Sequence, residues 1–215
     1  QRVSIARVLV REPSVFLFDE PLTSIEPERR VALKTQIKRI QEKLEQTSIY
    51  VTHDQAEALT FAEKVAVMDM GKIAQFDTVE GIYGRPTTTF VGFFIGSPGM
   101  NILEGHNKGD AIDLEDFTIK LPEKMRLPQN IENVRVGIRP EHVEISEREK
   151  AGWARFRVEA FEDVAKGFGI LHIVTKHQKV RARTGTYIKE GSDAWVNFPP
   201  DNLHLFDEKG MRIAT

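Results

Sequence analysis

The chain has 215 residues, enough for one large domain or two of ordinary size. Hydrophobic residues make up 40% and charged residues 29%, which is typical of a globular protein. Basic and acidic residues are balanced, 12 and 13 up to Pro98 and 18 and 19 after it, which argues against a nucleic-acid-binding protein. The chain has no cysteine, which excludes disulfides, thiolate catalysis and cysteine-based zinc sites.

The first informative segment is an apolar run that ends in two carboxylates. A short helix is predicted over residues 2–10, and the four apolar residues Val15–Phe18 then predict a strand buried on both faces, as in a parallel sheet. Asp19 and Glu20 follow directly. In an open α/β sheet the carboxyl ends of the strands carry the ligand groups. One carboxylate there can hold Mg²⁺ while the other orients a water, as phosphoryl transfer requires. The alternative is that both merely cap the next helix.

Strands and helices alternate over the next fifty residues. Pro27 occupies a favoured first helical position, and its helix is predicted to reach Gln46. One apolar stripe runs along that helix and consists of Leu33, Ile37, Ile40 and Leu44. A strand, a helix and two further strands are predicted over residues 48–52, 54–61, 65–68 and 73–76, with a turn at residues 70–72. This alternation predicts a mostly parallel sheet.

Four motifs in this region occur in an order and spacing that resemble the second half of an ABC-transporter nucleotide-binding domain. They are Gln1-Arg2 as the end of the signature motif, Phe16–Glu20 as the Walker B strand, Thr23–Glu26 as the D-loop and His53 as the switch histidine. The family D-loop usually ends in aspartate, whereas this chain has Glu26. The fold implied is an α/β, partial P-loop-NTPase-type parallel sheet.

The resemblance implies a role for each matching residue. Asp19 would hold the Mg²⁺ of ATP through water, Glu20 would polarise the attacking water, and His53 would contact the γ-phosphate. Gln1 would face the nucleotide of a second subunit. The D-loop residues Thr23, Ser24, Ile25 and Glu26 would lie at the same dimer interface.

The same resemblance implies cofactors, partners and a location. The cofactors are ATP and Mg²⁺ in the intact protein. The partners are a second ATPase subunit and the membrane permease subunits, with no nucleic acid expected. The location is cytoplasmic and peripheral, on the inner face of the cell membrane.

An uncharged stretch, residues 86–103, separates the two halves of the chain. A spanning helix needs about 20 mostly apolar residues, but this stretch contains two prolines, three glycines, three threonines and a serine. It is therefore predicted to be a linker. The segments Ile82–Pro86 and Phe90–Asn101 resemble the linker of carbohydrate-type importer ATPases, in the maltose and glycerol-phosphate group.

After the linker, short alternating segments predict strands of a small barrel. They cover residues 111–114, 117–121, 134–138, 155–161, 170–174, 180–183 and 194–198. The strings Asn101–Gly105, Val136–His142 and Leu203–Asp207 resemble the OB-like TOBE domain of the same importers. The expected domains are 1–84 for the C-terminal half of the nucleotide-binding domain, 85–98 for the linker and 99–215 for the OB-like domain.

The family's glycine-rich phosphate loop, G-x-x-x-x-G-K-[ST], is absent from these 215 residues, as is the Q-loop. We therefore expect the chain to be part of a longer protein and to be inactive as an ATPase by itself. Three functions remain open. The first is the ATP-hydrolysing, energy-coupling subunit of an importer of a sugar or related solute. The second is a non-catalytic regulatory or interaction module, if these residues are the whole product. The third, a DNA-maintenance ATPase of the same superfamily, would need a long coiled coil and would lack the TOBE-like tail.

Overall fold

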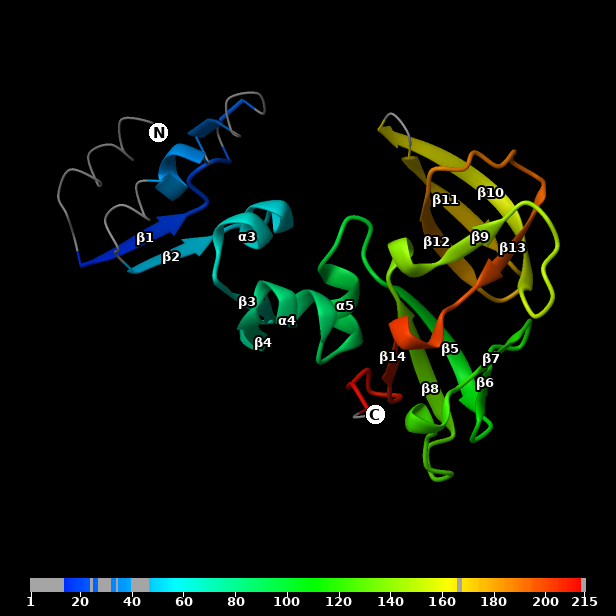
Figure 1. Cartoon of the computed structure of the whole chain (residues 1–215). Helices are drawn as coiled ribbons and strands as arrows, with labels where there is room; N and C mark the ends of the chain where they lie inside the picture. Colours follow the sequence, from blue (N-terminus) through cyan, green and yellow to red (C-terminus); the bar gives the residue numbers. More distant parts are fainter. Residues whose placement is uncertain are drawn as a thin grey trace. The chain divides into compact units, whose positions relative to one another are not determined.

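The structure is a computed structural model, and it describes residues 14–23, 25–26, 32–33, 35–39, 47–165 and 168–213. These residues form two compact units that divide between Val65 and Ala66 (Figure 1). Each unit is described by itself below. The domain limits expected from the sequence, at residues 84 and 98, remain predictions.

The first unit contains a pair of parallel strands and a short helix. Strand β1 (Val15–Asp19) pairs with β2 (Thr47–Val51) in a register that aligns Phe16 with Ser48 and Asp19 with Val51. Helix α3 (Gln55–Phe61) follows β2. Residues 32–33 and 35–39 are helical, so the described part of the predicted helix from Pro27 is confirmed. A small core unites these elements and consists of Phe16, Phe18, Leu22 and Ile37.

The prediction that the first strand is buried on both faces is wrong for the described residues. Phe16 and Phe18 are 0% and 6% exposed, whereas Val15 and Leu17 are 46% and 72% exposed. Side chains alternate between the two faces of a strand. The core residues Leu22 and Ile37 cover only the face that carries the two phenylalanines.

The boundary between the units falls near the start of a hairpin, which two short helices follow. Strands β3 (Lys64–Asp69) and β4 (Lys72–Thr78) are joined at Met70 and Gly71, whose φ values of 45° and 76° suit a tight hairpin turn. Helices α4 (Val79–Gly84) and α5 (Thr89–Phe94) follow, capped by the side chains of Thr78 and Thr88. No helix among the described residues has the length and apolar composition needed to cross a membrane.

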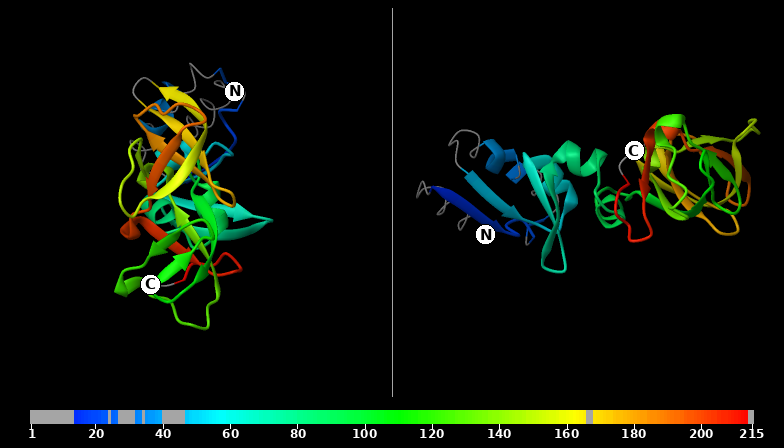
Figure 2. Two further views of the ribbon diagram at one scale, coloured as in Figure 1. Left: turned by 90° about the vertical axis from the view of Figure 1, so that its right-hand side faces the viewer. Right: turned by 90° about the horizontal axis from the view of Figure 1, so that it is seen from below.

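The rest of the described second unit is a barrel-like arrangement of two five-stranded sheets (Figures 1 and 2). One has the order β14-β8-β5-β6-β7 and contains β5 (Asn101–Asn107), β6 (Ala111–Asp113), β7 (Thr118–Lys120), β8 (Asn133–Ile138) and β14 (Leu203–Phe206). The other has the order β12-β11-β10-β13-β9 and contains β9 (Glu144–Ser146), β10 (Ala154–Ala165), β11 (Phe168–Val174), β12 (Lys179–Thr184) and β13 (Asp193–Asn197).

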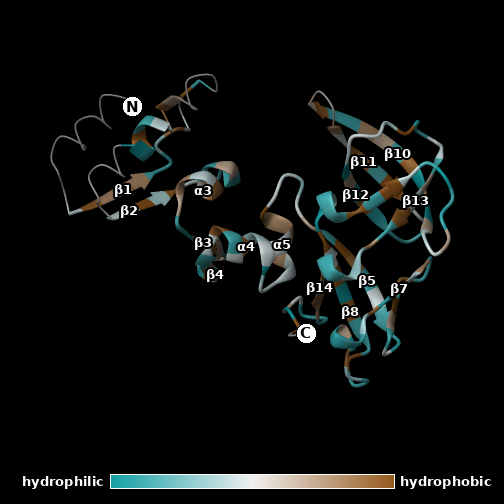
Figure 3. Ribbon diagram, viewed as in Figure 1, coloured by the Kyte–Doolittle hydropathy of each residue, from teal (hydrophilic) through white to brown (hydrophobic). Residues whose placement is uncertain are grey.

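Alternation of apolar and polar residues places one face of each strand in a shared core. Figure 3 shows this as bands of brown and teal along the barrel strands. On β8 the residues Val134, Val136 and Ile138 are buried, and they pack in the same cluster as Phe156 and Val158 of β10. The order predicted from the sequence, an α/β part followed by an all-β barrel, is confirmed.

Two buried amide side chains connect the edge strand β12 and its hairpin to the other sheet. The Asn101 side chain donates to the Arg181 carbonyl at 2.9 Å and accepts from the Arg181 N–H at 2.8 Å, imitating one backbone pair of a sheet. Gln178 donates to the carbonyls of Glu104 and Leu114 at 3.1 and 3.4 Å. These bonds satisfy backbone groups that would otherwise be buried without partners, which is costly.

A buried arginine fastens the two helices to the barrel. Arg139 follows β8 and is 1% exposed. Its guanidinium donates to the carbonyls of Gly92, Ile95 and Tyr83, and it lies 3.8 Å from the centre of the Tyr83 ring. The Tyr83 hydroxyl in turn donates to Glu141. Burial and this carboxylate raise the pKa of Tyr83 to about 12. A cation at the C-terminal end of a helix is favourable because it satisfies the last carbonyls.

The end of the described chain pairs with the segment between α4 and α5. The N–H of Thr89 donates to the Gly210 carbonyl, and the N–H of Arg212 donates to the Thr87 carbonyl, both at 2.8 Å. Gln75 of β4 accepts from the N–H of Thr87 at 2.8 Å. Backbone and side-chain bonds therefore hold the predicted linker against other parts of the second unit.

Candidate functional site

The two predicted carboxylates and the predicted histidine follow the ends of neighbouring strands. Asp19 ends β1, and His53 comes two residues after the end of β2. Because the strands are parallel, their carboxyl ends meet at one edge of the sheet. The Glu20 N–H donates to the Val51 carbonyl at 2.9 Å, which extends the pairing by one residue.

Glu20 leaves the strand in a conformation that is unusual for its residue type. Its φ is 43°, in the left-handed region, which costs a non-glycine residue about 1–2 kcal/mol. Such conformations occur in tight turns and are also concentrated at functional sites. The turn at Glu20 is accompanied by a bond from the N–H of Thr23 to the Glu20 carbonyl at 3.3 Å.

The structure brings the side chains of Glu20 and His53 together. The Nδ1 atom of His53 lies 3.1 Å from Oε1 of Glu20, and the other carboxylate oxygen accepts from the Thr23 hydroxyl at 3.3 Å. The two side chains are 45% and 68% exposed, so a ligand can reach them. A carboxylate oriented in this way can accept a proton from a water molecule, and the imidazole can donate to an anionic oxygen.

Asp19 is exposed and lies beside this pair in the sequence. The described residues contain no group of three or more acidic, histidine or cysteine side chains that could hold a metal ion. Mg²⁺ nevertheless suits a single carboxylate, because in nucleotide sites it keeps several waters and takes its other ligands from phosphates. Asp19 therefore fits a magnesium–nucleotide site and not an all-protein metal cage.

The segment predicted as a D-loop is described only in part. Thr23 contacts Glu20, and the N–H of Ile25 donates to the Leu22 carbonyl at 3.1 Å. The Ile25 side chain is partly buried against the core of the first unit, and Glu26 is exposed. Ser24 and Gln1, two of the predicted site residues, lie outside the described residues.

Sequence reasoning missed one residue next to the site. Glu57, in the first turn of α3, is only 4% exposed. Its Oε2 atom accepts from the Thr52 hydroxyl at 2.8 Å and from the Tyr50 hydroxyl at 3.2 Å. The available signal was its position three residues after the N-cap residue Asp54, where a glutamate commonly takes part in capping.

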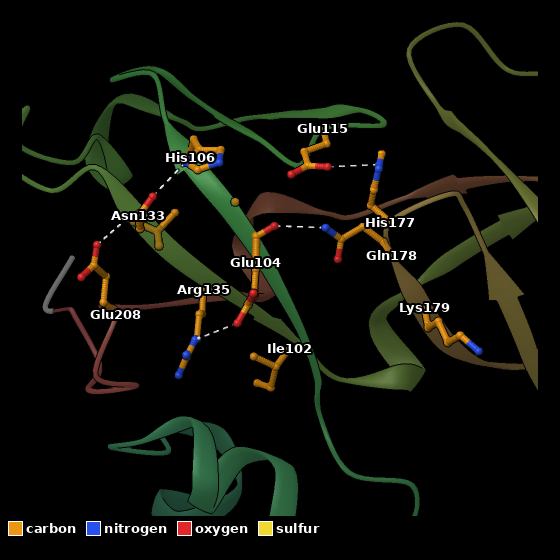
Figure 4. A pocket seen from close by; sticks show the side chains of 12 residues that line it. Ile102, Glu104, His106, Glu115, Asn133, Arg135, His177, Gln178, Lys179 and Glu208 are labelled. Atoms are coloured by element: carbon orange, nitrogen blue, oxygen red, sulfur yellow. Dashed lines mark hydrogen bonds and ion pairs between the residues drawn. The ribbon is translucent and has the colours of Figure 1, made fainter.

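A concave region lies on the barrel and contains none of the predicted site residues. It has a volume of about 730 Å³ and is lined by charged and polar groups that pair with one another (Figure 4). Glu104 lies 3.5 Å from Arg135, His106 lies 2.9 Å from Asn133, and Glu115 contacts His177 at 3.1 Å. This mutual pairing leaves no evident excess of charge to select a ligand.

Comparison with known proteins adds to this geometry. Residues 96–143 match the family described as the MalK OB fold domain. The chain is 38% identical over 222 residues to the sn-glycerol-3-phosphate import ATP-binding protein UgpC of Escherichia coli O1:K1, covering 99% of this chain and 61% of that protein. Corresponding proteins of Salmonella typhimurium and Psychromonas ingrahamii are 36% and 37% identical, over 99% and 96% of this chain.

The chain thus spans about three fifths of the length of the curated relatives that it matches. The match to the OB-fold family covers β5 and β8, and it confirms that the all-β part of the predicted fold is OB-like. Together these findings confirm the resemblance seen in the sequence: the chain corresponds to part of the ATP-binding subunit of an ABC importer, and that part includes the OB-fold domain.

Proposed function

We propose that the chain belongs to the ATP-hydrolysing, energy-coupling subunit of an importer for a sugar or a related solute. The observation that carries this proposal is the pairing of Glu20 with His53 at the ends of two parallel strands. The similarity to glycerol-3-phosphate import proteins supports it. The subunit would lie on the inner face of the cell membrane, against permease subunits and a second ATPase subunit.

Each residue of the site has a distinct task in this proposal. Glu20 polarises the attacking water, a contribution typically worth about 10²–10⁴-fold in rate. His53 contacts the γ-phosphate, and Asp19 holds Mg²⁺ through water. Bound Mg-ATP would supply the phosphoryl group and the ion that neutralises its charge. Gln1 and the D-loop residues would lie at the interface with the second subunit.

The first test is to read the coding sequence upstream of the Gln1 codon. The proposal expects an in-frame G-x-x-x-x-G-K-[ST] loop there, because backbone N–H groups of such a loop bind the phosphates. A coding sequence that starts without this loop would contradict the proposal and favour the regulatory module.

The second test measures phosphate release by the whole gene product. Glu20→Gln should lower turnover by roughly 10²-fold or more while ATP binding is retained. Glu63→Gln, which changes an exposed glutamate after α3, is the matched control and should hydrolyse at the wild-type rate. The 215 residues alone should release no phosphate. Wild-type turnover in Glu20→Gln would refute the assignment.

A further inference from the structure

The turn that carries His53 consists of Thr52, His53 and Asp54, and it lies between the end of β2 and the start of α3. Hydrogen bonds among Thr52, Asp54 and Glu57 hold this turn. The Asp54 carboxylate accepts from the N–H of Glu57 at 3.2 Å and so caps the helix. The Thr52 hydroxyl accepts from the N–H of Asp54 at 2.9 Å.

Glu57 contributes to the turn through a hydrogen bond with the Thr52 side chain. In an ordinary capping box, the glutamate three residues after the N-cap bonds directly to the N–H of the N-cap residue. Here the Glu57 carboxylate accepts from the Thr52 hydroxyl at 2.8 Å, and that hydroxyl accepts from the Asp54 N–H. A hydroxyl can donate once and accept at the same time, so Thr52 transmits the contact. The backbone on both sides of His53 is fixed as a result.

The carboxylate of Glu57 is also attached to the core. It accepts from the Tyr50 hydroxyl at 3.2 Å, and the Tyr50 ring stacks on Phe61 with centroids 5.5 Å apart. The same ring contacts Phe18 of β1 at 5.9 Å. Burying a carboxylate costs free energy unless it is hydrogen-bonded. The Tyr50 and Thr52 hydroxyls therefore stabilise the Glu57 carboxylate, and the carboxylate in turn fixes the positions of these two side chains.

We propose that Glu57 is a positioning residue that holds His53 against Glu20 through the Thr52 hydroxyl. This inference rests on the proposed function for its importance in catalysis, but the geometry that it predicts is measurable without ATP. The competing interpretation is that Glu57 and Thr52 only stabilise the start of α3. In that case, removing the Thr52 hydroxyl would weaken the helix and leave the contact between Glu20 and His53 unchanged.

The state of the His53 ring distinguishes the two interpretations. A carboxylate only accepts, so a ring nitrogen paired with Glu20 must carry a proton. Long-range ¹H–¹⁵N spectra of the ¹⁵N-labelled 215-residue chain at pH 8 report which nitrogen is protonated, and His53→Gln assigns the signal. We expect protonated Nδ1 in the wild type and in the control Glu63→Gln. We expect its loss in Glu20→Gln.

Thr52→Val removes the hydroxyl at nearly constant volume, and Thr52→Ser restores it. The inference expects the population protonated at Nδ1 to fall at least twofold in Thr52→Val and in Glu57→Ala, with the wild-type value in Thr52→Ser. Amide exchange of Glu20, whose N–H bonds to Val51, checks that the strand ends remain paired. An unchanged ring in Thr52→Val overturns the inference, as does a loss of Glu20 amide protection together with the ring signal.

The outcomes separate this inference from the proposed function. If Thr52→Val keeps Nδ1 protonated while Glu20→Gln abolishes phosphate release, the positioning role fails and the proposed function stands. If the wild-type ring carries its proton on Nε2 alone, the contact with Glu20 is absent in solution and the positioning role fails. If the ring responds as expected while Glu20→Gln hydrolyses ATP normally, the positioning role stands and the proposed function fails.

Discussion

His204 on β14 is a partly buried base in a positively charged setting. It pairs with Gly137 of the neighbouring strand β8, and its Nδ1 atom is buried without a hydrogen-bond partner among the described residues. Burial lowers the pKa of His204 to about 4, and Arg212, Arg139 and His142 add to the effect. The folded protein therefore holds this ring neutral at pH values where an unfolded chain would protonate it.

This difference predicts that stability is lost in mildly acidic solution. Between about pH 6.5 and pH 4 the unfolded state binds a proton that the folded state does not, so the free energy of unfolding falls as the pH falls. The loss is at most about 1.4 kcal/mol per pH unit. Denaturant unfolding across this range should give a shallower pH dependence for His204→Gln than for the wild type. The exposed His106→Gln should follow the wild type, and parallel curves for all three proteins would contradict the prediction.

At the scale of elements, Arg139 determines how α4 and α5 are held. Replacing it with methionine keeps an apolar stem but removes the donors to the carbonyls of Tyr83, Gly92 and Ile95. Hydrogen bonds to charged groups contribute about 1.5–3 kcal/mol each and are not additive. We expect Arg139→Met to lower the free energy of unfolding by about 3 kcal/mol and to speed amide exchange in α5. The exposed Arg126→Met is the control, and equal effects of the two substitutions would show that the buried guanidinium does not hold the helices.

Sequence patterns predicted the helices and turns that are determined by residues close together in the chain. Helix α3 was predicted to within a residue, although Asp54 proved to be its N-cap, and the turn at Met70 and Gly71 was also predicted. The helix α4 was missed, because two glycines in six residues give it no apolar periodicity of its own. Its Tyr83 carbonyl accepts a hydrogen bond from Arg139, which lies far along the chain.

In the candidate site, too, local features could be predicted from the sequence and contacts between distant residues could not. Asp19 and Glu20 could be chosen from the sequence because they come at the end of a recognisable apolar strand, and His53 could be chosen through its resemblance to the switch histidine. Their contact could not be predicted, because it needs the strand register and the positive φ of Glu20. Glu57 was missed because an acidic residue in an amphipathic helix is ordinarily exposed, and its bonds to the hydroxyls of Tyr50 and Thr52 become visible only in the folded structure.

At the scale of the whole molecule, the second unit should fold without the first. Its core is continuous across both sheets of the barrel, and its described boundary precedes β4, α4 and α5. A chain of residues 66–215 should therefore show cooperative unfolding. A chain of residues 99–215 should be less stable, because Arg139 would be left without its carbonyl partners.

Thermal unfolding and amide exchange of these two shorter chains test the prediction. Equal stability would mean that residues 66–98 contribute nothing to the barrel, and absence of protected amides in both would mean that the barrel depends on the first unit.

The pairing of Gly210 and Arg212 with Thr89 and Thr87 has a consequence for synthesis. The ribosome releases the segment between α4 and α5 well before it releases its partners at the end of the described chain. At about 5–20 residues per second, the earlier segment waits on the order of ten seconds for these bonds. During that interval its backbone groups bond to water, and translation past Arg212 is required before the junction between hairpin and barrel acquires its final structure.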